Sequence, residues 1–275
     1  MTLKRSRRTN YKGAVKMVKK LKISAGHGEK VSGANGFIKE HDEADKVTAG
    51  VAKYLKANYV CDVETFDEKT ATTQNGNLYN IDAWHDRTHS DLNLFVHFNA
   101  ASATATGTEA FGMSTAGIKY AKQFSKAMAK ALGVKDRGGM YKNLYVLRNT
   151  KAVGVLLEVV FVTNKKDVEK YKKEFDDLCA AIGDVAADIL GYKRKKSKMK
   201  KVSGGIVTKE KINYYDGPRW NKPTGQKGGG SKHEVVGIVE VDGYPMYKTK
   251  SGNYMTAADK FVTYYDAAQW KNVCK

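Results

Sequence analysis

The sequence predicts an α/β fold with a mostly parallel, twisted sheet and helices on both faces, followed by a small all-β domain. Short apolar runs alternate with amphipathic helical segments over residues 20–191, as in successive βα units. A dense basic run at 193–201 interrupts this periodicity, and short aromatic-rich segments separated by glycines follow it. The expected division is a basic N-terminal arm (1–19), an α/β domain (20–191), a basic linker (192–203) and an all-β domain (204–275).

The α/β domain is expected to open with a short strand at Leu21 and Ile23, followed by a turn around His27. Glycines on both sides of His27 allow a sharp turn that leaves the imidazole at the end of a strand. An amphipathic pattern predicts a helix from Glu40 to about Ala57. The elements expected next are a strand at 59–66, a loop at 67–77, a helix at 80–88 and a buried strand at 92–100.

The second half of this domain repeats the alternation of strands and helices. An apolar stripe predicts a helix over 116–132 that ends at Gly133, and a second helix is expected over 167–190, with Gly191 after its end. The most apolar strand is expected at 153–164. The remaining expected elements are a strand or sheet edge at 108–113, a loop at 137–139 and a short strand at 144–147.

Composition limits the classes of protein that need to be considered. The net charge of +19 favours polyanionic partners, with nucleic acid, wall polymers and anionic lipids as the candidates. There is no apolar run of about 18 residues, and the basic N-terminus lacks the apolar segment of a signal peptide. Three widely spaced cysteines indicate neither a disulfide framework nor a thiolate zinc site, which favours a reducing cytosol as the place of synthesis.

Candidate chemistry rests first on Glu158, the single charge in the apolar strand at 153–164. An unpaired buried carboxylate is costly, so Glu158 is expected to be paired, protonated or linked to a metal. His27 and His97 lie near strand ends, and Glu40 opens a helix. A catalytic zinc takes three such ligands and leaves one position open, while a further carboxylate acts as base. Taken alone, either histidine could instead be an ordinary residue with hydrogen bonds inside the protein and no role as a metal ligand.

The segments that carry these residues resemble one known family. SAGHG, a glutamate opening a helix, VHFNA and LLEVVFVTN occur in the order and spacing of the zinc-dependent N-acetylmuramoyl-L-alanine amidases, over about residues 20–191. The resemblance implies one Zn²⁺ ion held by His27, Glu40 and His97, with Glu158 as the catalytic acid and base. It also implies hydrolysis of the amide between N-acetylmuramic acid and L-alanine in peptidoglycan.

Several assignments within this resemblance stay open. The pattern places Asn99 and Asn164 as substrate-binding candidates. Glu43, one turn after Glu40, is the main rival for the metal-ligand position, and His41 is a weaker one. His85 and His89 form a His-Asp-x-x-His sequence, but the aspartate is one methylene shorter than the base that such zinc motifs need. A surface helix is therefore the preferred interpretation of that segment.

Residues 204–275 resemble, less specifically, the SH3-like wall-binding modules of such enzymes. Short strands, glycine turns and many aromatic residues carry this resemblance. Exposed aromatic side chains would stack on sugars or hold a peptide, whereas buried ones would form the core of a small barrel. The basic linker would attract the phosphates of wall polymers. The wall-contact candidates are Tyr214, Tyr215, Trp220, Tyr244 and Tyr247.

An enzyme that cleaves cell wall without an export signal is expected to be a phage endolysin, held in the host cytoplasm until it is released to the wall. Its expected partners are peptidoglycan and anionic wall polymers. Nucleic-acid binding and membrane insertion are not expected, and a monomer is favoured over an oligomer. The alternatives are another zinc amidohydrolase or peptidase, a basic nucleic-acid-binding protein, and a wall-binding protein without catalysis.

Overall fold

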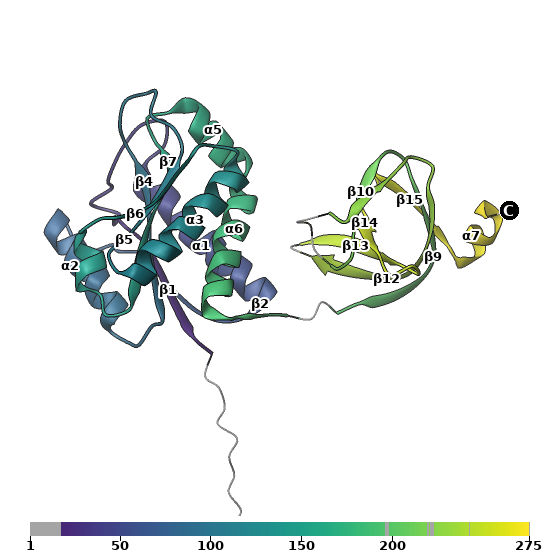
Figure 1. The fold of residues 1–275 in the computed structure, drawn as a ribbon, viewed down its shortest axis with the longest axis horizontal. Helices are drawn as coiled ribbons and strands as arrows, with labels where there is room; N and C mark the ends of the chain where they lie inside the picture. The colour runs from purple at the N-terminus through teal and green to yellow at the C-terminus, as the bar shows by residue number, and fades with distance from the viewer. Residues whose placement is uncertain (1–17, 196–197, 219, 221–222, 242, 275) are drawn as a thin grey trace, which may run out of the picture. The chain divides into compact units, whose positions relative to one another are not determined.

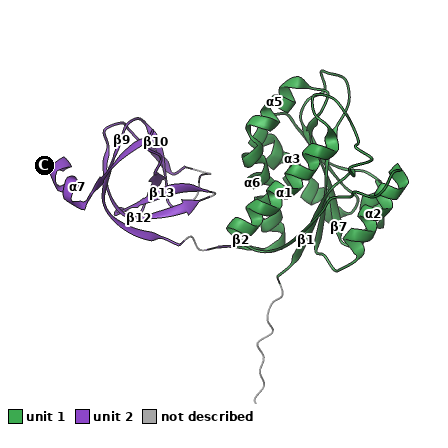
Figure 2. Cartoon of the chain, turned by 180° about the vertical axis from the view of Figure 1, so that it is seen from behind, with its two compact units in different colours: residues 1–193 green, residues 194–275 purple. Residues whose placement is uncertain are grey.

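The computed structural model describes residues 18–195, 198–218, 220, 223–241 and 243–274. The chain divides into two compact units, Met1–Lys193 and Arg194–Lys275 (Figure 2). Most of the expected N-terminal arm, residues 1–17, lies outside the described residues. Within the part of the chain that the structure describes, no helix has the length and apolar character needed to cross a bilayer.

The first unit is built on a six-stranded sheet with the order β3-β1-β4-β7-β5-β6. Neighbouring strands are parallel throughout except for β5, which runs antiparallel to β7. The mostly parallel sheet that the sequence predicts is therefore confirmed. The strands are β1 (Lys20–Ala25), β3 (Asp62–Phe66), β4 (Leu92–Asn99), β5 (Thr108–Gly112), β6 (Asp136–Tyr141) and β7 (Val153–Phe161).

Helices cover both faces of this sheet, as predicted. Figure 1 shows α1, α3 and α6 on one side and α2 on the other. Side chains alternate between the faces along β4: Leu94 and Val96 join the larger core, while Phe95 belongs to a smaller core that also includes residues of α2 and α4. The helices are α1 (Glu40–Asn58), α2 (Gln74–Asp86), α3 (Thr115–Leu132), α4 (Tyr145–Asn149), α5 (Lys165–Lys173) and α6 (Phe175–Leu190).

Several sequence-based boundaries were wrong. Helix α2 begins six residues before the expected start because Thr73 caps it, accepting a hydrogen bond from the Gly76 amide. The strand expected at 59–66 is interrupted at Cys61, giving β2 (Tyr59–Val60) and β3. The helix expected over 167–190 is two helices, α5 and α6, which meet at Glu174.

Three further segments differ in type from the expectation. The strand expected at 144–147 is the short helix α4, since a four-residue apolar run does not distinguish the two structures. The loop expected at 137–139 is part of β6, and the segment expected as a possible sheet edge is the interior strand β5. The basic stretch expected as a linker is partly strand, with β8 at Lys193–Arg194 and the start of β9 at Lys200.

The second unit is a small antiparallel β structure, as predicted. Its described residues form a seven-stranded sheet with the order β11-β10-β14-β13-β12-β9-β15. Ile206, Val235 and Met255 lie at the centre of one small core, and Val239 and Met246 lie in another. A short helix that the sequence did not indicate, α7 (Ala267–Val273), begins at a capping box formed by Asp266 and Gln269. The strands are β9 (Lys200–Thr208), β10 (Ile212–Tyr215), β11 (Gly225–Lys227), β12 (Lys232–Val241), β13 (Tyr244–Thr249), β14 (Tyr254–Thr256) and β15 (Val262–Asp266).

Candidate active site

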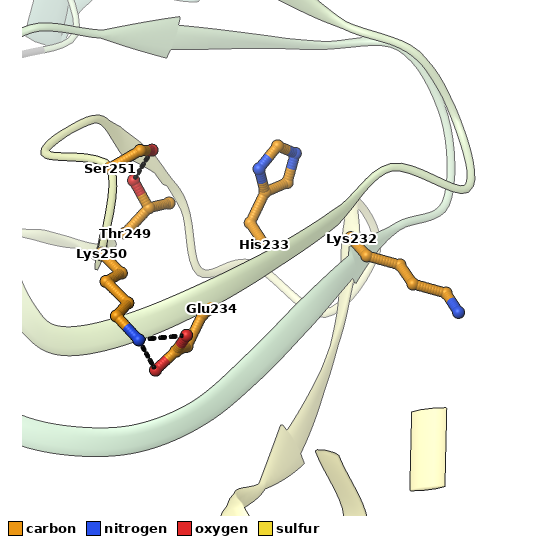
Figure 3. A pocket seen from close by; sticks show the side chains of 6 residues that line it. All are labelled: Lys232, His233, Glu234, Thr249, Lys250 and Ser251. Atoms are coloured by element: carbon orange, nitrogen blue, oxygen red, sulfur yellow. Dashed lines mark hydrogen bonds and ion pairs between the residues drawn. The ribbon is translucent and has the colours of Figure 1, made fainter. Parts of the chain in front are cut away.

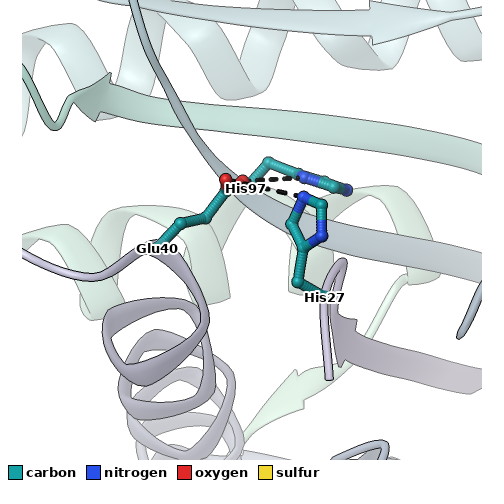
Figure 4. A group of neighbouring side chains, drawn as sticks. All are labelled: His27, Glu40 and His97. Atoms are coloured by element: carbon teal, nitrogen blue, oxygen red, sulfur yellow. Dashed lines mark hydrogen bonds and ion pairs between the residues drawn. The ribbon is translucent and has the colours of Figure 1, made fainter. Parts of the chain in front are cut away.

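Three polar side chains meet at the carboxyl ends of the parallel strands (Figure 4). His27 follows β1, His97 lies near the end of β4, and Glu40 is the first residue of α1. One ligand atom from each lies within 4.8 Å of the others. This edge is where open α/β sheets place their ligands, and two imidazoles with one carboxylate form a donor set that suits a divalent metal such as zinc.

Glu40 is held in place through both of its carboxylate oxygens. Its Oε1 accepts a hydrogen bond from the Phe98 amide at 3.0 Å and lies 2.9 Å from His97 Nδ1. Its Oε2 accepts a hydrogen bond from the Ala34 amide at 2.7 Å and lies 3.5 Å from His27 Nε2. A carboxylate in the first turn is also favoured by the helix dipole. The helix start, the adjacent loop and β4 together fix this side chain.

Two glycines leave room for the cluster. A Cβ atom at Gly26 would lie 1.7 Å from His97 Nε2, inside the imidazole ring. A Cβ atom at Gly33, which has φ +71°, would lie 2.4 Å from Glu40 Oε2 and 2.6 Å from His27 Cδ2. Both loops therefore need glycine because the backbone approaches the cluster so closely.

The pKa values of His27 and Glu40 suit metal ligands, whereas the pKa of His97 is raised because its contacts with Glu40 and Glu158 outweigh burial. Burial, followed by the nearby charge of His97, lowers the pKa of His27 to about 4, so its imidazole is neutral at pH 7. Burial acts to raise the pKa of Glu40, but its contacts with His97 and His27 outweigh burial, so the net pKa is lowered. His27 Nδ1 is buried without a hydrogen-bond partner among the described residues. A neutral imidazole with an unpartnered nitrogen beside an ionised carboxylate fits a bound cation.

Glu158 lies next to this cluster on the neighbouring strand. It is in direct register with His97 across the parallel pair β4–β7, and with Glu109 across the antiparallel pair β5–β7. Its Oε2 is buried and has no hydrogen-bond partner in the described structure. Burial raises the pKa of Glu158 to about 7, and the charges of Glu40 and Glu109 add to this effect while His97 opposes it. A carboxyl group with such a pKa can both accept and donate a proton near neutral pH.

Comparison with known proteins assigns this arrangement to a family. The model of the N-acetylmuramoyl-L-alanine amidase family matches residues 22–186, which include the whole cluster and Glu158. The chain belongs to this amidase family. It is 31% identical to the endolysin of Bacillus phage SPP1, over 90% of this chain and 98% of that protein.

Solved structures agree with the assignment to the amidase family. The catalytic domain of CwlV, an N-acetylmuramoyl-L-alanine amidase from Paenibacillus polymyxa, is 27% identical and superposes with a TM-score of 0.56, covering 64% of this chain and 99% of that domain. The catalytic domain of the CD27L endolysin, which targets Clostridia Difficile, has the same fold, with 24% identity, a TM-score of 0.57, and 62% and 97% coverage. In the second unit of this amidase, residues 199–262 match the model of a domain of unknown function.

The rival ligand candidates are engaged elsewhere. Glu43 accepts a hydrogen bond from the Tyr171 hydroxyl at 2.8 Å and pairs with Lys46. His41 lies 2.9 Å from Asp67 through its Nε2. Neither residue belongs to the group of potential ligands found among the described residues.

The His-Asp-x-x-His segment does not form a second metal site in the described part of the chain. His85 is fully buried, and its Nε2 lies 3.0 Å from Ser24 Oγ. His89 follows the end of α2, and 82% of its side chain is exposed. The preferred interpretation as a surface helix agrees with the structure, in which His85 and Ile81 lie on the buried side of α2 and Tyr79 is exposed.

Both asparagines proposed for substrate binding already make hydrogen bonds within the protein. Asn99 donates from Nδ2 to Glu109 at 2.7 Å, and its Oδ1 accepts from the Ala100 amide. Asn164 caps α5 by accepting from the Asp167 amide, and it donates to the Ala105 carbonyl. These bonds order the loops at the site, while direct contact of either residue with substrate stays a prediction.

Three charged residues near Glu158 were not singled out in the sequence. Glu109 lies opposite Glu158 and forms an ion pair with Arg137 of β6 at 2.6 Å. The charge of Lys142 influences the pKa of both His97 and Glu158. Glu109 is an acidic residue in a short apolar strand, the same signal that identified Glu158, and it was available in the sequence.

The wall-contact candidates of the second unit differ widely in exposure. Tyr215 is buried, and Tyr214, Tyr247 and Trp220 are partly buried against the two small cores. Tyr244 is the most exposed of the five predicted residues, at 62%. Most of these aromatic side chains therefore contribute to the core of the second unit. Contact of any of them with the cell wall stays a prediction.

The second unit also contains a pocket at the ends of β12 and β13 (Figure 3). Four of its lining residues form two pairs, since Lys250 pairs with Glu234 at 2.9 Å and the hydroxyls of Thr249 and Ser251 lie 3.0 Å apart, while His233 Nε2 is buried without a hydrogen-bond partner among the described residues. Lys232 and His233 complete the lining. This pocket presents no uncompensated cluster of charge.

Proposed function

We propose that this protein hydrolyses the amide bond between N-acetylmuramic acid and L-alanine in peptidoglycan. The observation that carries the proposal is the convergence of His27, Glu40 and His97 beside Glu158, in a chain that belongs to the amidase family. A zinc peptidase on the same kind of sheet is the closest alternative, and the products that each enzyme would release distinguish the two.

His27, Glu40 and His97 would hold one Zn²⁺ ion, and the unpartnered His27 Nδ1 and ionised Glu40 support that fit. When bound, zinc would polarise the substrate carbonyl and lower the pKa of a water molecule. The carboxylate of Glu158 takes a proton from the attacking water, and the same carboxyl then donates it to the leaving alanine amine. The raised pKa of Glu158 suits both steps.

The cellular role that fits best is that of a phage endolysin. The similarity to the SPP1 endolysin extends over nearly the full length of both chains and so includes the second unit. An endolysin would remain in the host cytoplasm until lysis and would then act on the wall as a monomer.

The second unit would keep the enzyme on its polymeric substrate. Residues 194–275 contain more than twice as many basic as acidic residues, so anionic wall polymers are the expected ligand. Tyr244 offers an exposed aromatic surface in the same unit. Tethering by such a unit raises the effective concentration of enzyme at its substrate without changing the chemistry.

Binding to isolated walls is expected to depend strongly on salt. Because exposed charges are screened over about 8 Å at physiological ionic strength and about 3 Å at 1 M, we expect at least about a tenfold loss of wall affinity between these conditions. Co-sedimentation of the full-length protein with walls measures this affinity. Walls stripped of their anionic polymers serve as the control, and equal binding to stripped and intact walls would argue against charge as the attraction.

The function itself is tested on isolated Gram-positive walls, with and without a chelator. An amidase releases new N-terminal alanine without new reducing sugars, and chelation abolishes the release until zinc is restored. New reducing sugars would instead indicate a glycosidase. New amino termini on residues other than the alanine attached to muramic acid would indicate a peptidase.

Gly26→Ala is expected to weaken metal binding because the new methyl group would overlap the His97 ring. Disturbed ligand orientation typically lowers metal affinity about 10- to 100-fold. Competition with a chelator of known affinity measures the change. Gly228→Ala is the matched control, since its added methyl group would meet no atom within 4 Å. Equal zinc affinity in the two variants would refute this account of Gly26.

A further inference from the structure

We propose that Arg137 is a substrate-recognition residue that binds a carboxylate on the peptide part of the substrate. This inference rests on the proposed function and adds a preference for substrates whose residue after L-alanine is acidic. It is carried by an ion pair, a bulged strand and an unused guanidinium group, all on the β5–β6 side of the candidate active site.

The first step is the position of Glu109, which anchors Arg137. Residues directly opposite in an antiparallel pair have Cβ atoms about 4.5–5.5 Å apart on the same face of the sheet. Glu109 and Glu158 form such a pair, so Glu109 lies within one side chain of the proposed catalytic group. Its two oxygens are both occupied, one by Asn99 Nδ2 at 2.7 Å and the other by Arg137 Nε at 2.6 Å. Glu109 therefore acts as a fixed support for Arg137.

The second step is the backbone that directs Arg137 toward this support. The register of β5 with β6 shifts between Thr108–Asp136 and Ala110–Gly139, so β6 contains one extra residue. Gly138 lies in this bulge with φ +92°, and its amide donates to Ser125 Oγ and Asp136 Oδ1. Bulges change the direction of side chains and are common next to active sites. The bulge explains why Arg137 lies beside Glu109.

The third step is what remains free on the guanidinium group. Its Nε is bonded to Glu109, and its Cζ lies 5.1 Å from the centre of the Phe161 ring. In the described structure neither terminal nitrogen of Arg137 makes a hydrogen bond, and 36% of the side chain is exposed. A guanidinium group fixed on one edge and one face, with its other edge open, is suited to bind a carboxylate with two hydrogen bonds.

The fourth step concerns charge. The carboxylates of Glu158 and Glu109 face the β5–β6 side of the site, whereas a zinc ion on His27, Glu40 and His97 would place its charge on the β1–β4 side. Arg137 is the cation on the β6 side that is held by direct contacts with the site. An acidic residue next to the cleaved bond that lies on this side of the site would thus be favoured by Arg137, and removing the guanidinium group would weaken its binding.

The test uses the zinc-loaded full-length enzyme and two synthetic muramoyl dipeptides. They differ only in the residue after L-alanine, which carries a free carboxylate in one compound and an amide in the other. Mass spectrometry of the released dipeptide gives kcat/KM for each. We expect the wild-type enzyme to favour the acidic compound about 10- to 100-fold, the usual range for a charge-assisted hydrogen-bonded pair. Arg137→Gln should remove this preference, chiefly through a higher KM for the acidic compound.

Two further variants make the result decisive. Arg137→Lys keeps the positive charge but loses the planar guanidinium group that can donate two parallel hydrogen bonds. This variant should therefore retain part of the preference for the acidic compound. Arg87→Gln is the matched control, because Arg87 follows α2 near Lys22 at the start of β1, away from the site, and should keep the full preference. If wild type and Arg137→Gln show the same ratio for the two compounds, the proposal for Arg137 fails while the amidase assignment stands. If wild type releases neither dipeptide although it is zinc-loaded, the proposed function fails as well.

Discussion

Glu158→Gln is expected to abolish amide hydrolysis while leaving zinc bound. The substitution keeps the size of the side chain but removes the group that accepts the proton of the attacking water and returns it to the leaving amine. Loss of a positioned acid and base typically costs about 10²–10⁴-fold in rate. Release of alanine amino termini from walls measures the rate, and elemental analysis of the dialysed protein measures zinc.

The control for this variant is Glu169→Gln, the same change at an exposed residue of α5. It should retain full activity and one zinc ion. The informative contrary result is loss of zinc in Glu158→Gln, because this would make Glu158 a metal ligand. Full activity with zinc retained would exclude Glu158 as the proton-transfer group and would direct attention to another acid.

Glu40→Gln is expected to lose both activity and stabilisation by zinc, whereas Glu43→Gln should keep both. Glu40 faces both histidines, while Glu43 bonds with Tyr171 and Lys46. A ligand present at about 100 times its Kd stabilises the folded state by about 2.7 kcal/mol. For a domain of this size that corresponds to a rise in Tm of roughly 5–10 °C.

Thermal unfolding with and without added zinc measures this difference for each variant. Wild type and Glu43→Gln should show the rise in Tm, and Glu40→Gln should not. Because Glu43→Gln replaces a charged acceptor of the Tyr171 hydroxyl with a neutral one and removes the ion pair with Lys46, its Tm without zinc should fall slightly, and only the zinc-dependent difference is compared. If zinc raises the Tm of Glu40→Gln but not that of Glu43→Gln, Glu43 and not Glu40 is the metal ligand.

The sequence predicted the elements whose patterns are local and strong. Helices α1 and α3, with the stop at Gly133, follow from apolar periodicity and a left-handed glycine. The metal cluster was predictable because the resemblance to the amidases fixed His27, Glu40 and His97, and the structure brings these three together. Their chemical roles follow from that resemblance and await the experiments above.

What the sequence did not reveal depends on contacts between distant strands. Arg137 belongs to a segment that was expected to be a loop because it contains two adjacent glycines, yet those glycines form a bulged edge strand. Glu109 showed the same local signal as Glu158, an acidic residue in an apolar strand, but its position opposite Glu158 depends on the reversed direction of β5, which no local pattern specifies. The boundary of α2 was missed for a different reason, since its cap at Thr73 lies in a polar stretch that resembles a loop.

The reversed direction of β5 has a consequence for protein engineering. It brings the starting ends of β5 and β6 to the same edge as the carboxyl ends of β1, β4 and β7. The metal ligands and Glu158 come from one group of segments, and Glu109 and Arg137 from another. Substitutions at position 137 are therefore expected to change which peptide substrates are cleaved without altering the segments that carry the metal ligands and Glu158, provided that Gly138 and Gly139 keep the bulge.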